Sequence, residues 1–395
     1  MKKKRVFVVV IDSLGVGFEE HSKEYGDEGA NTLKHIFEAT KGQYKIPNLM
    51  KLGMGNFCKV EGNPTINNQE AYTVTLKESS VGKDTMTGHW EMMGVLTTKP
   101  AVSFTDTGFP KELIDELESK TGYKVIGNKS ASGTEIIKEL GERQLKTKEL
   151  IVYTSADSVL QIAMNEELYG LDEIYKVCDI ARQITMKPEW MVGRIIARPY
   201  VGTNASNFER TPNRHDYALS PSDITTLDKL KESGYDVISI GKINDIFNTK
   251  GITKAIKSKS SVEGMQQTID TAKDEFNGIC FTNLVDFDAK WGHRRNPEGY
   301  AKELVEFDKL LLDLINNLKD DDILMITADH GNDPTWTGSD HTREMVPLLI
   351  YSKSFKSNKD LKIKQSFACI GATIADIFGV EKPTKIGESL LKELD

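Results

Sequence analysis

The sequence lacks the cysteine patterns that would have narrowed its class at once. Only four of its 395 residues are cysteine, and they lie far apart with no CxxC pair among them. This spacing excludes a zinc ribbon and a thioredoxin-type redox motif, and it gives no framework of disulfides. A reducing, cytoplasmic compartment is therefore the expected location.

Long hydrophobic runs are also absent. No stretch approaches the roughly 20 apolar residues of a membrane span. The basic start MKKKR is followed by an apolar run at residues 6–11. That run is shorter than the core of a secretion signal, which needs about 7–15 apolar residues. We interpret it as a buried first strand.

Positive charge is not in excess, since 51 Lys and Arg against 59 Asp and Glu give a net charge of −8. A nucleic-acid partner is not expected, because phosphate backbones call for a basic surface. Small phosphorylated substrates need only a local basic pocket. A hydrophobic fraction of 38% with 28% charged residues is typical of a soluble globular protein. No apolar stripe indicates an interface, and a monomer is expected.

The sequence does contain an alternation of strand and helix patterns, which predicts an α/β protein with a parallel, doubly wound core sheet. Strands are predicted at 6–11, 151–153, 192–198, 237–240, 279–285, 323–327 and 347–351. Helices are predicted at 31–39, 47–52, 110–121, 132–143, 171–185, 262–275, 297–318 and 370–378, and residues 82–94 form a turn entering a helix. The segment 101–218 is bracketed by prolines and has a different character. We interpret it as an inserted α/β cap domain between core segments 1–100 and 219–395.

Six side chains of metal-binding type follow the ends of predicted core strands. Three are carboxylates and three are imidazoles, which is enough for two divalent cations, and the carboxyl ends of strands are where ligands bind in an open α/β sheet. Mixed oxygen and nitrogen ligands suit Mn²⁺, Zn²⁺ or Fe²⁺, whereas Mg²⁺ alone would favour oxygen. A single strand-terminal Asp could instead cap a helix, and a single His could be structural. The six are Asp12, Asp288, His293, Asp329, His330 and His341.

Two metals a few ångströms apart can clamp an in-line phosphoryl displacement and activate its nucleophile. The segment KDTMTGH, residues 83–89, offers that nucleophile. Thr85 lies at a turn entering a helix, whose free N–H groups favour a phosphate. A metal-ligated hydroxyl there could carry a phosphoryl group covalently. Thr85 could also be a plain N-cap, and Thr87 is a rival for the same role.

Basic residues gather near the end of the predicted cap. Arginine forks match phosphate oxygens, although scattered arginines are often only surface charge. Ser155 and Asp157, which follow the strand predicted at 151–153, could hold sugar hydroxyls. The basic residues are Arg194, Arg198, Arg210, Arg214 and Lys242.

Eight segments together closely resemble bacterial phosphopentomutases, a family of the alkaline phosphatase superfamily. KDTMTGHWE and RTPNRHD are more specific to that family than the metal motifs, and the resemblance covers essentially the whole chain. The segments are VVVIDSLGVG, GKDTMTGHWEMMG, IGNKSASGTEI, YTSADSVLQIA, MVGRIIARPYVG, RTPNRHDYAL, NLVDFDA and TADHGNDPTWTGSDHTRE.

The resemblance implies an isomerase that interconverts ribose 1-phosphate and ribose 5-phosphate, and likewise the 2-deoxyribose phosphates, and so joins nucleoside breakdown to central carbon metabolism. It implies Thr85 as the phosphorylated nucleophile, lying between two Mn²⁺ ions, and priming by glucose 1,6-bisphosphate. It favours Asp288 over Asp286 as a ligand.

The resemblance also assigns the remaining residues to two kinds of site. Asp12, Asp329 and His330 would hold one Mn²⁺, and Asp288, His293 and His341 the other. Substrate contacts would come from Ser155, Asp157, Arg194, Arg210 and Lys242.

Two other functions are compatible with parts of this pattern. The first is a cofactor-independent phosphoglycerate mutase, phosphatase or phosphodiesterase of the same superfamily. Threonine at position 85, rather than the serine typical of that mutase, speaks against it. The second is a non-catalytic metal-binding scaffold, against which the complete ligand set speaks.

Overall fold

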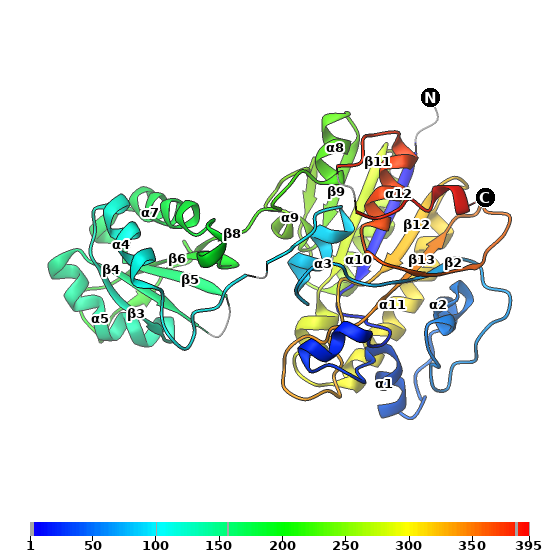
Figure 1. Ribbon diagram of the computed structural model, residues 1–395, viewed down its shortest axis with the longest axis horizontal. Helices are drawn as coiled ribbons and strands as arrows, with labels where there is room; N and C mark the ends of the chain where they lie inside the picture. Colours follow the sequence, from blue (N-terminus) through cyan, green and yellow to red (C-terminus); the bar gives the residue numbers. More distant parts are fainter. Residues whose placement is uncertain (1–3, 100, 156–157, 384–385, 395) are drawn as a thin grey trace. The chain divides into compact units, whose positions relative to one another are not determined.

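The chain, in a computed structural model that describes residues 4–99, 101–155, 158–383 and 386–394, forms two compact units (Figure 1). Unit 1 combines Met1–Thr98 with Ser220–Asp395, and unit 2 is Lys99–Leu219. Each unit has its own sheet. Every helix among the described residues is too short or too polar to cross a bilayer.

Unit 1 is built on an eight-stranded sheet in the order β10-β9-β11-β1-β12-β13-β2-β14. All neighbours pair in parallel except β13, which is antiparallel to both β12 and β2. The prediction of a parallel, doubly wound sheet is therefore confirmed, with β13 as the exception in strand direction. The strands are β1 (Arg5–Ile11), β2 (Tyr72–Leu76), β9 (Asp236–Ile240), β10 (Lys254–Ile256), β11 (Gly278–Leu284), β12 (Ile323–Thr327), β13 (Val346–Tyr351) and β14 (Asp360–Lys364).

Strand β1 lies at the centre of this sheet, between β11 and β12. Every residue of β1 is buried, as expected for an uninterrupted apolar run covered on both faces. Val10 is level with Asn283 on β11 and with Thr327 on β12, so the three strands end at the same edge. Residues that follow these three strands are therefore brought together.

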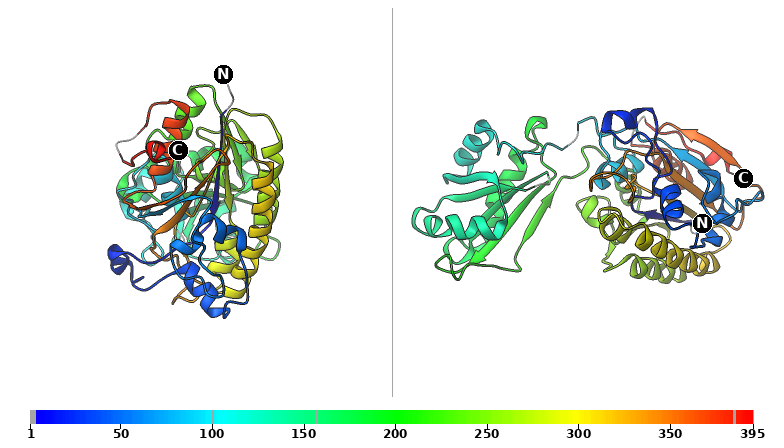
Figure 2. Two further views of the ribbon diagram at one scale, coloured as in Figure 1. Left: turned by 90° about the vertical axis from the view of Figure 1, so that its right-hand side faces the viewer. Right: turned by 90° about the horizontal axis from the view of Figure 1, so that it is seen from below.

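Helices cover both faces of the sheet, which makes unit 1 doubly wound. Helices α10 and α11 pack against each other on one face, and α3, α8 and α12 lie on the other (Figure 2). Residues Phe287–Gly292 form a π-helical turn after β11. The helices are α1 (Thr32–Ala39), α2 (Pro47–Leu52), α3 (Thr85–Met92), α8 (Thr226–Glu232), α9 (Ile243–Ile246), α10 (Ser261–Lys273), α11 (Pro297–Asn317) and α12 (Cys369–Phe378).

Unit 2 has a six-stranded sheet in the order β3-β4-β5-β6-β7, with β8 also paired to β6. Helices α4 and α7 cover one face of the sheet and α5 covers the other, so unit 2 has two separate apolar cores. Its helices are α4 (Lys111–Thr121), α5 (Gly133–Thr147), α6 (Glu166–Tyr169) and α7 (Leu171–Ile184). Its strands are β3 (Val125–Ser130), β4 (Leu150–Thr154), β5 (Val159–Asn165), β6 (Arg194–Val201), β7 (Glu209–Arg210) and β8 (His215–Ala218).

The structure corrects the prediction for this segment in three places. Strands β3, β5, β7 and β8 were not predicted, and β5 lies between the two strands that were, antiparallel to β4 and parallel to β6. Strand β6 begins at Arg194 rather than at residue 192, and α5 continues to Thr147 rather than ending at residue 143.

Candidate active site

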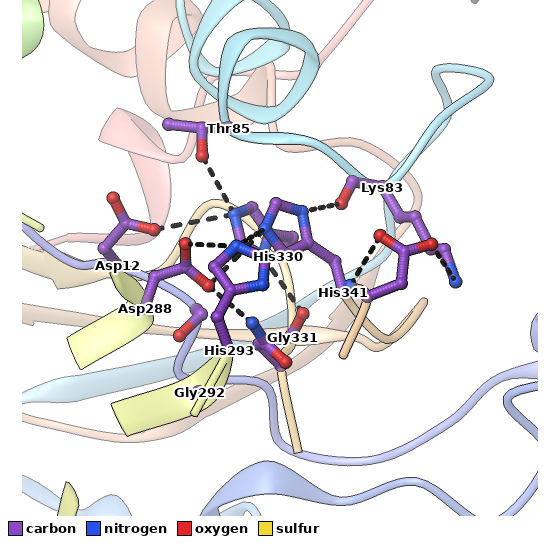
Figure 3. Close-up of polar contacts among 12 residues, drawn as sticks. Asp12, Lys83, Thr85, Asp288, Gly292, His293, His330, Gly331 and His341 are labelled. Carbon is purple, nitrogen blue, oxygen red and sulfur yellow. Dashed lines mark hydrogen bonds and ion pairs between the residues drawn. The ribbon is translucent and has the colours of Figure 1, made fainter. Parts of the chain in front are cut away.

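Six side chains at the carboxyl edge of the unit 1 sheet form two groups of metal-ligand type. Within each group the ligand atoms lie within 4.8 Å of one another. Figure 3 shows members of both groups pointing toward a common centre. One group is Asp12, Asp329 and His330, and the other is Asp288, His293 and His341.

The first group is fully buried. Asp12 directly follows β1, and Asp329 is the second residue after β12. Nε2 of His330 lies 3.5 Å from Oδ1 of Asp12 and 3.3 Å from Oδ2 of Asp329. Neither of these two carboxylate oxygens has a hydrogen-bond partner in the described part of the chain. Buried polar atoms without partners are rare, and two carboxylate oxygens aimed at one imidazole nitrogen leave a place for a cation.

The second group is more exposed. Asp288 and His293 come from the π-helical turn and its end, and Nε2 of His293 lies 3.1 Å from Oδ2 of Asp288. Nε2 of His341 lies 3.4 Å from Oδ1 of Asp288 and 3.1 Å from Nε2 of His293. Asp286 is turned to other partners, accepting a hydrogen bond from the backbone N–H of Ser261 and pairing with Lys290.

The three histidines are oriented alike. The Nδ1 atom of each faces a backbone carbonyl: that of Gly331 for His330 at 3.0 Å, Ser339 for His293 at 2.6 Å and Lys83 for His341 at 2.7 Å. A carbonyl can only accept, so Nδ1 carries the proton and the lone pair of Nε2 is directed into the site. This is the arrangement by which metal-ligating histidines are usually held.

Thr85 lies beside the first group. It is the first residue of α3, whose N-cap is Asp84 rather than a threonine. Its Oγ1 lies 3.2 Å from Nε2 of His330 (Figure 3). The rival Thr87 is buried and its hydroxyl donates to Asp84 at 2.6 Å. Of the two hydroxyls, that of Thr85 is the one near the ligand groups.

Sequence reasoning did not identify the residues that hold these carboxylates in place. The amide of Asn283 donates to Oδ2 of Asp12 at 2.8 Å, and that of Asn332 donates to Oδ1 of Asp288 at 2.6 Å. His89 is fully buried, with Nδ1 at 2.8 Å from the carbonyl of Thr85 and 3.3 Å from Oδ2 of Asp329. Of these three residues, only Asn283 could have been found from the sequence, because it is a polar residue inside an otherwise apolar strand.

The backbone after β1 is strained at Ser13, a non-glycine residue with φ of 72°. Its N–H donates to Oδ1 of Asp329 at 3.0 Å, and its carbonyl accepts from the N–H of Asn332 at 3.2 Å. Its hydroxyl lies 3.2 Å from that of Tyr300. A left-handed residue costs on the order of 1–3 kcal/mol and clusters at functional sites. These hydrogen bonds keep the backbone of Ser13 in its left-handed conformation, and that conformation orients the neighbouring Asp12.

The carboxylates have shifted pKa values with distinct causes. Burial raises the pKa of Asp12, and the negative charges of Asp329 and Asp288 raise it further. Burial also opposes ionisation of Asp288, but the imidazoles of His293 and His341, when they are protonated in the metal-free chain, outweigh it and lower the pKa of that carboxyl. The carboxylate of Asp288 in turn raises the pKa of His293. Three carboxylates held this close call for compensating positive charge.

The donor set fits two divalent cations. Each group supplies carboxylate oxygen and neutral imidazole nitrogen, the chemistry preferred by Mn²⁺, Zn²⁺ and Fe²⁺. The orphaned oxygens of Asp12 and Asp329 are the positions where coordination would replace a missing hydrogen bond.

The residues expected to contact substrate fall in both units. Lys242 belongs to unit 1, at the N-cap of α9, and its charge acts on Asp12. Ser155, Arg194 and Arg210 belong to unit 2, where Arg194 lies 3.8 Å from Asp216. Asp157 lies outside the described residues.

Comparison with known proteins identifies the family of this chain. Residues 4–382 match the model of the metalloenzyme superfamily. The phosphopentomutase of Clostridium beijerinckii is 58% identical over 396 residues, and that of Agathobacter rectalis is 58% identical over 397 residues. Both alignments cover 100% of this chain and 100% of the relative.

A solved structure of Leishmania mexicana phosphoglycerate mutase is 13% identical, with a TM-score of 0.53 over 99% of this chain and 98% of that one. At this identity the likeness shows a shared fold. Full-length identity of 58% to curated relatives carries the assignment: the chain belongs to the phosphopentomutase family, within the metalloenzyme superfamily.

Proposed function

We propose that this protein interconverts ribose 1-phosphate and ribose 5-phosphate, and the corresponding 2-deoxyribose phosphates, through a phosphothreonine at position 85. The observation that carries the proposal is the hydroxyl of Thr85, 3.2 Å from His330 and beside two groups of metal-ligand side chains. Family membership at 58% identity supports the choice of substrate.

The proposed reaction transfers one phosphoryl group out and another back. The free sugar hydroxyl of a pentose monophosphate attacks the phosphorus on Thr85, the bond from that phosphorus to Oγ1 breaks, and the proton of the hydroxyl ends on Oγ1. The product is ribose 1,5-bisphosphate. Oγ1 then attacks the other phosphoryl group, which leaves the isomeric monophosphate. Priming of Thr85 would come from a sugar bisphosphate such as glucose 1,6-bisphosphate.

The side chains have separate tasks in this cycle. Two divalent cations, which we propose to be Mn²⁺, would offset the charge of the phosphoryl oxygens and of the attacking hydroxyl when bound. Asp12, Asp329 and His330 would hold one cation, and Asp288, His293 and His341 the other. The start of α3 directs backbone N–H groups and the positive end of its dipole toward a phosphate on Thr85.

Substrate recognition is assigned to the residues outside the metal groups. Lys242 from unit 1, with Ser155, Asp157, Arg194 and Arg210 from unit 2, would contact the sugar phosphate. We propose that unit 2 is a cap that limits access of water, so that transfer to sugar is faster than hydrolysis. A monomer supplies all of these residues.

The nucleophile is tested with Thr85→Ala, and Thr87→Ala is the matched control. Thr85→Ala should abolish mutase activity in a coupled assay while metal content stays at two ions per chain. It should also abolish the gain of one phosphoryl mass after incubation with glucose 1,6-bisphosphate. Retained turnover in Thr85→Ala would refute the nucleophile.

The substrate class is tested separately with the unaltered chain. Ribose 1-phosphate should be converted, whereas 3-phosphoglycerate should not. Metal analysis of the isolated protein tests the proposal of Mn²⁺ against Zn²⁺ and Fe²⁺. Conversion of 3-phosphoglycerate alone would assign the chain to the other mutase chemistry of this fold, and absence of any turnover with two metals bound would favour a scaffold.

A further inference from the structure

Helix α3, which begins at Thr85, packs directly against the backbone that carries a proposed metal ligand. A Cβ on Gly88 would lie 2.0 Å from the backbone carbonyl oxygen of Asp329 and 2.8 Å from its carbonyl carbon. Gly88 lies inside the helix, so the close approach of the two backbones, and not an unusual conformation, requires a glycine here. The helix of the proposed nucleophile and the end of β12 are therefore in contact.

The next residue, His89, joins the same two segments through its side chain. The imidazole is completely buried. Its Nδ1 lies 2.8 Å from the carbonyl oxygen of Thr85 and 3.3 Å from Oδ2 of Asp329. A carbonyl can only accept, so Nδ1 carries a proton. One N–H group thus faces both the backbone of the proposed nucleophile and the carboxylate of a proposed metal ligand.

The other ring nitrogen of His89 faces Asn283 on β11. Nδ2 of Asn283 lies 3.4 Å from Nε2 of His89 and 2.8 Å from Oδ2 of Asp12. An amide nitrogen has two hydrogens, so Asn283 can donate to both, and Nε2 accepts with its lone pair. A continuous series of contacts therefore leads from the backbone of Thr85 through His89 and Asn283 to Asp12.

We propose that His89 is a positioning residue for the nucleophile: its imidazole keeps the first turn of α3 in register with the group of Asp12, Asp329 and His330, so that the hydroxyl of Thr85 stays beside that group. The inference rests on the proposed function, in which Thr85 carries the phosphoryl group. His89 takes no part in making or breaking bonds, because its ring is enclosed and both of its nitrogens have partners within the chain.

The proposed cycle depends on this register twice, since Oγ1 of Thr85 is the leaving group in one transfer and the nucleophile in the other. Helix ends fray, and Thr85 is the first residue of a helix of eight residues. The N-cap Asp84 bonds to Thr87 within the same segment, so it does not tie the helix to the sheet. His89 does so, because Asp329 and Asn283 belong to the carboxyl edge of the sheet.

Two variants of His89 separate the donor from the ring. His89→Phe keeps a ring of similar size and removes both nitrogens. His89→Asn loses the ring but places an amide N–H near the position of Nδ1, so it can still donate to the carbonyl of Thr85. The control is Thr373→Val on α12, a helix that packs beside α3. Its buried hydroxyl accepts from the N–H of Leu390 and lies outside the ligand groups.

Three measurements on the full-length chain distinguish positioning from general stability. The first is calorimetric titration of chelated protein with Mn²⁺. The second is the rate at which the chain gains one phosphoryl mass from glucose 1,6-bisphosphate at saturating Mn²⁺, followed by quenched intact-mass analysis. The third is hydrogen exchange of the amides of residues 87–89 in the metal-free chain, which does not depend on any reaction.

His89→Phe should slow the phosphoryl gain about 100-fold even at saturating Mn²⁺, because a shift of about 1 Å in a reacting group costs that much. It should weaken one of the two Mn²⁺ equivalents about 10–100-fold, since Asp329 loses an outer contact. Amides 87–89 should exchange faster. His89→Asn should recover most of the phosphorylation rate. Thr373→Val should lower the melting temperature and leave all three measurements unchanged.

Two results would overturn the proposal: an unaltered rate of phosphoryl gain in His89→Phe at saturating Mn²⁺, or equal slowing by His89→Asn and His89→Phe. If His89→Phe does not fold, Asn283→Ser takes its place, since it keeps the imidazole and removes its link to Asp12. It should slow the gain about tenfold, and an unaltered rate would likewise count against the role. Failure of the proposed function is seen separately, as absence of phosphoryl gain in the unaltered chain. Unaltered exchange of residues 87–89 in His89→Phe would then overturn the positioning role by itself.

Discussion

Arg343 offers the sharpest test of how the site is held together. Its buried guanidinium donates to the carboxylate of Glu78 and to the backbone carbonyls of Glu78, Ser80 and Gly82. The next carbonyl along, that of Lys83, accepts from Nδ1 of His341. Arg343 thus fixes the loop that leads into α3 and that orients one of the proposed metal ligands.

The perturbation is Arg343→Lys, which keeps the positive charge and removes the forked guanidinium group. A lysine ammonium is one point with three donors, so it cannot reach all four acceptors. Leaving two buried carbonyls unpaired at 1–3 kcal/mol each destabilises the fold by roughly 2–6 kcal/mol. Loss of an outer hydrogen bond to a ligating histidine typically weakens metal binding about 10–100-fold. That loss should fall on the group containing His341 and spare the group of Asp12.

The matched control is Arg5→Lys. Arg5 is as buried as Arg343, and it bonds Asp322 and the carbonyls of Ala272 and Asp274. It lies at the beginning of β1, and the proposed site lies beyond the end of that strand. Both variants should lose similar stability in thermal melts. Only Arg343→Lys should bind the second Mn²⁺ equivalent more weakly in calorimetric titration.

Hydrogen exchange of the metal-free chain provides a readout that does not depend on activity. Residues 78–84 should exchange faster in Arg343→Lys and at the unaltered rate in Arg5→Lys. The reasoning is refuted if Arg343→Lys loses stability but binds both metal equivalents as before. Equal weakening of both equivalents would also refute it, because the loop touches only one group.

Three further outcomes are expected. Asn332→Ala, which removes the amide that donates to Asp288, should weaken the second metal equivalent about tenfold in the same titration and leave the first unchanged. Burial raises the pKa of Glu344 from 4.5 to about 7. The folded chain therefore holds a proton between those values that the unfolded chain releases, so stability falls as pH rises through this window, by about 3 kcal/mol in total. From pH 4.5 to 7.5 the melting temperature of the unaltered chain should fall relative to that of Glu344→Gln, which has no carboxyl to titrate at this position. A constant difference between the two melting temperatures would contradict the raised pKa of Glu344. Added Mn²⁺ should raise the melting temperature of chelated protein, with about 4 kcal/mol gained at a thousand times the dissociation constant, and a melting temperature indifferent to Mn²⁺ would count against the metal sites.

The edge on which the metal-type residues meet could be predicted because the signal is local. Asp12, Asp288 and Asp329 each follow an apolar run closely, and parallel strands end at one edge. The supporting contacts could not be predicted, because they join distant segments. His89 lies against Asp329, and Asn332 against Asp288. Nothing in the spacing of those residues indicates their pairing.

The reversed direction of β13 had a signal that was overlooked. Parallel neighbours need a crossover connection, usually a helix. The segment between Thr327 and Val346 contains no helix, and it carries His330 and His341 instead. A connection that returns without a crossover joins antiparallel strands. The ligand loop and the reversed strand are therefore one feature of the chain.

The missed strands of unit 2 have a different cause. Strand β5 begins only five residues after Thr154, the last residue of β4. Both strands are buried throughout, so neither shows the alternation of a half-exposed strand. Strand β3, by contrast, has a single buried residue and ends in polar residues. Hydrophobic periodicity identifies neither a fully buried strand nor a largely polar one. Such strands are defined by their pairing with neighbouring strands.

The two units share one electrostatic principle with opposite signs. Asp12, Asp288 and Asp329 lie close together, and the pKa of Asp12 is raised by burial first and by the charges of Asp329 and Asp288 second. In unit 2, the pKa of Arg198 is lowered by burial first and by the charges of Arg214 and Arg210 second. Like charges kept this close cost free energy in the empty protein and recover it when a counterion binds.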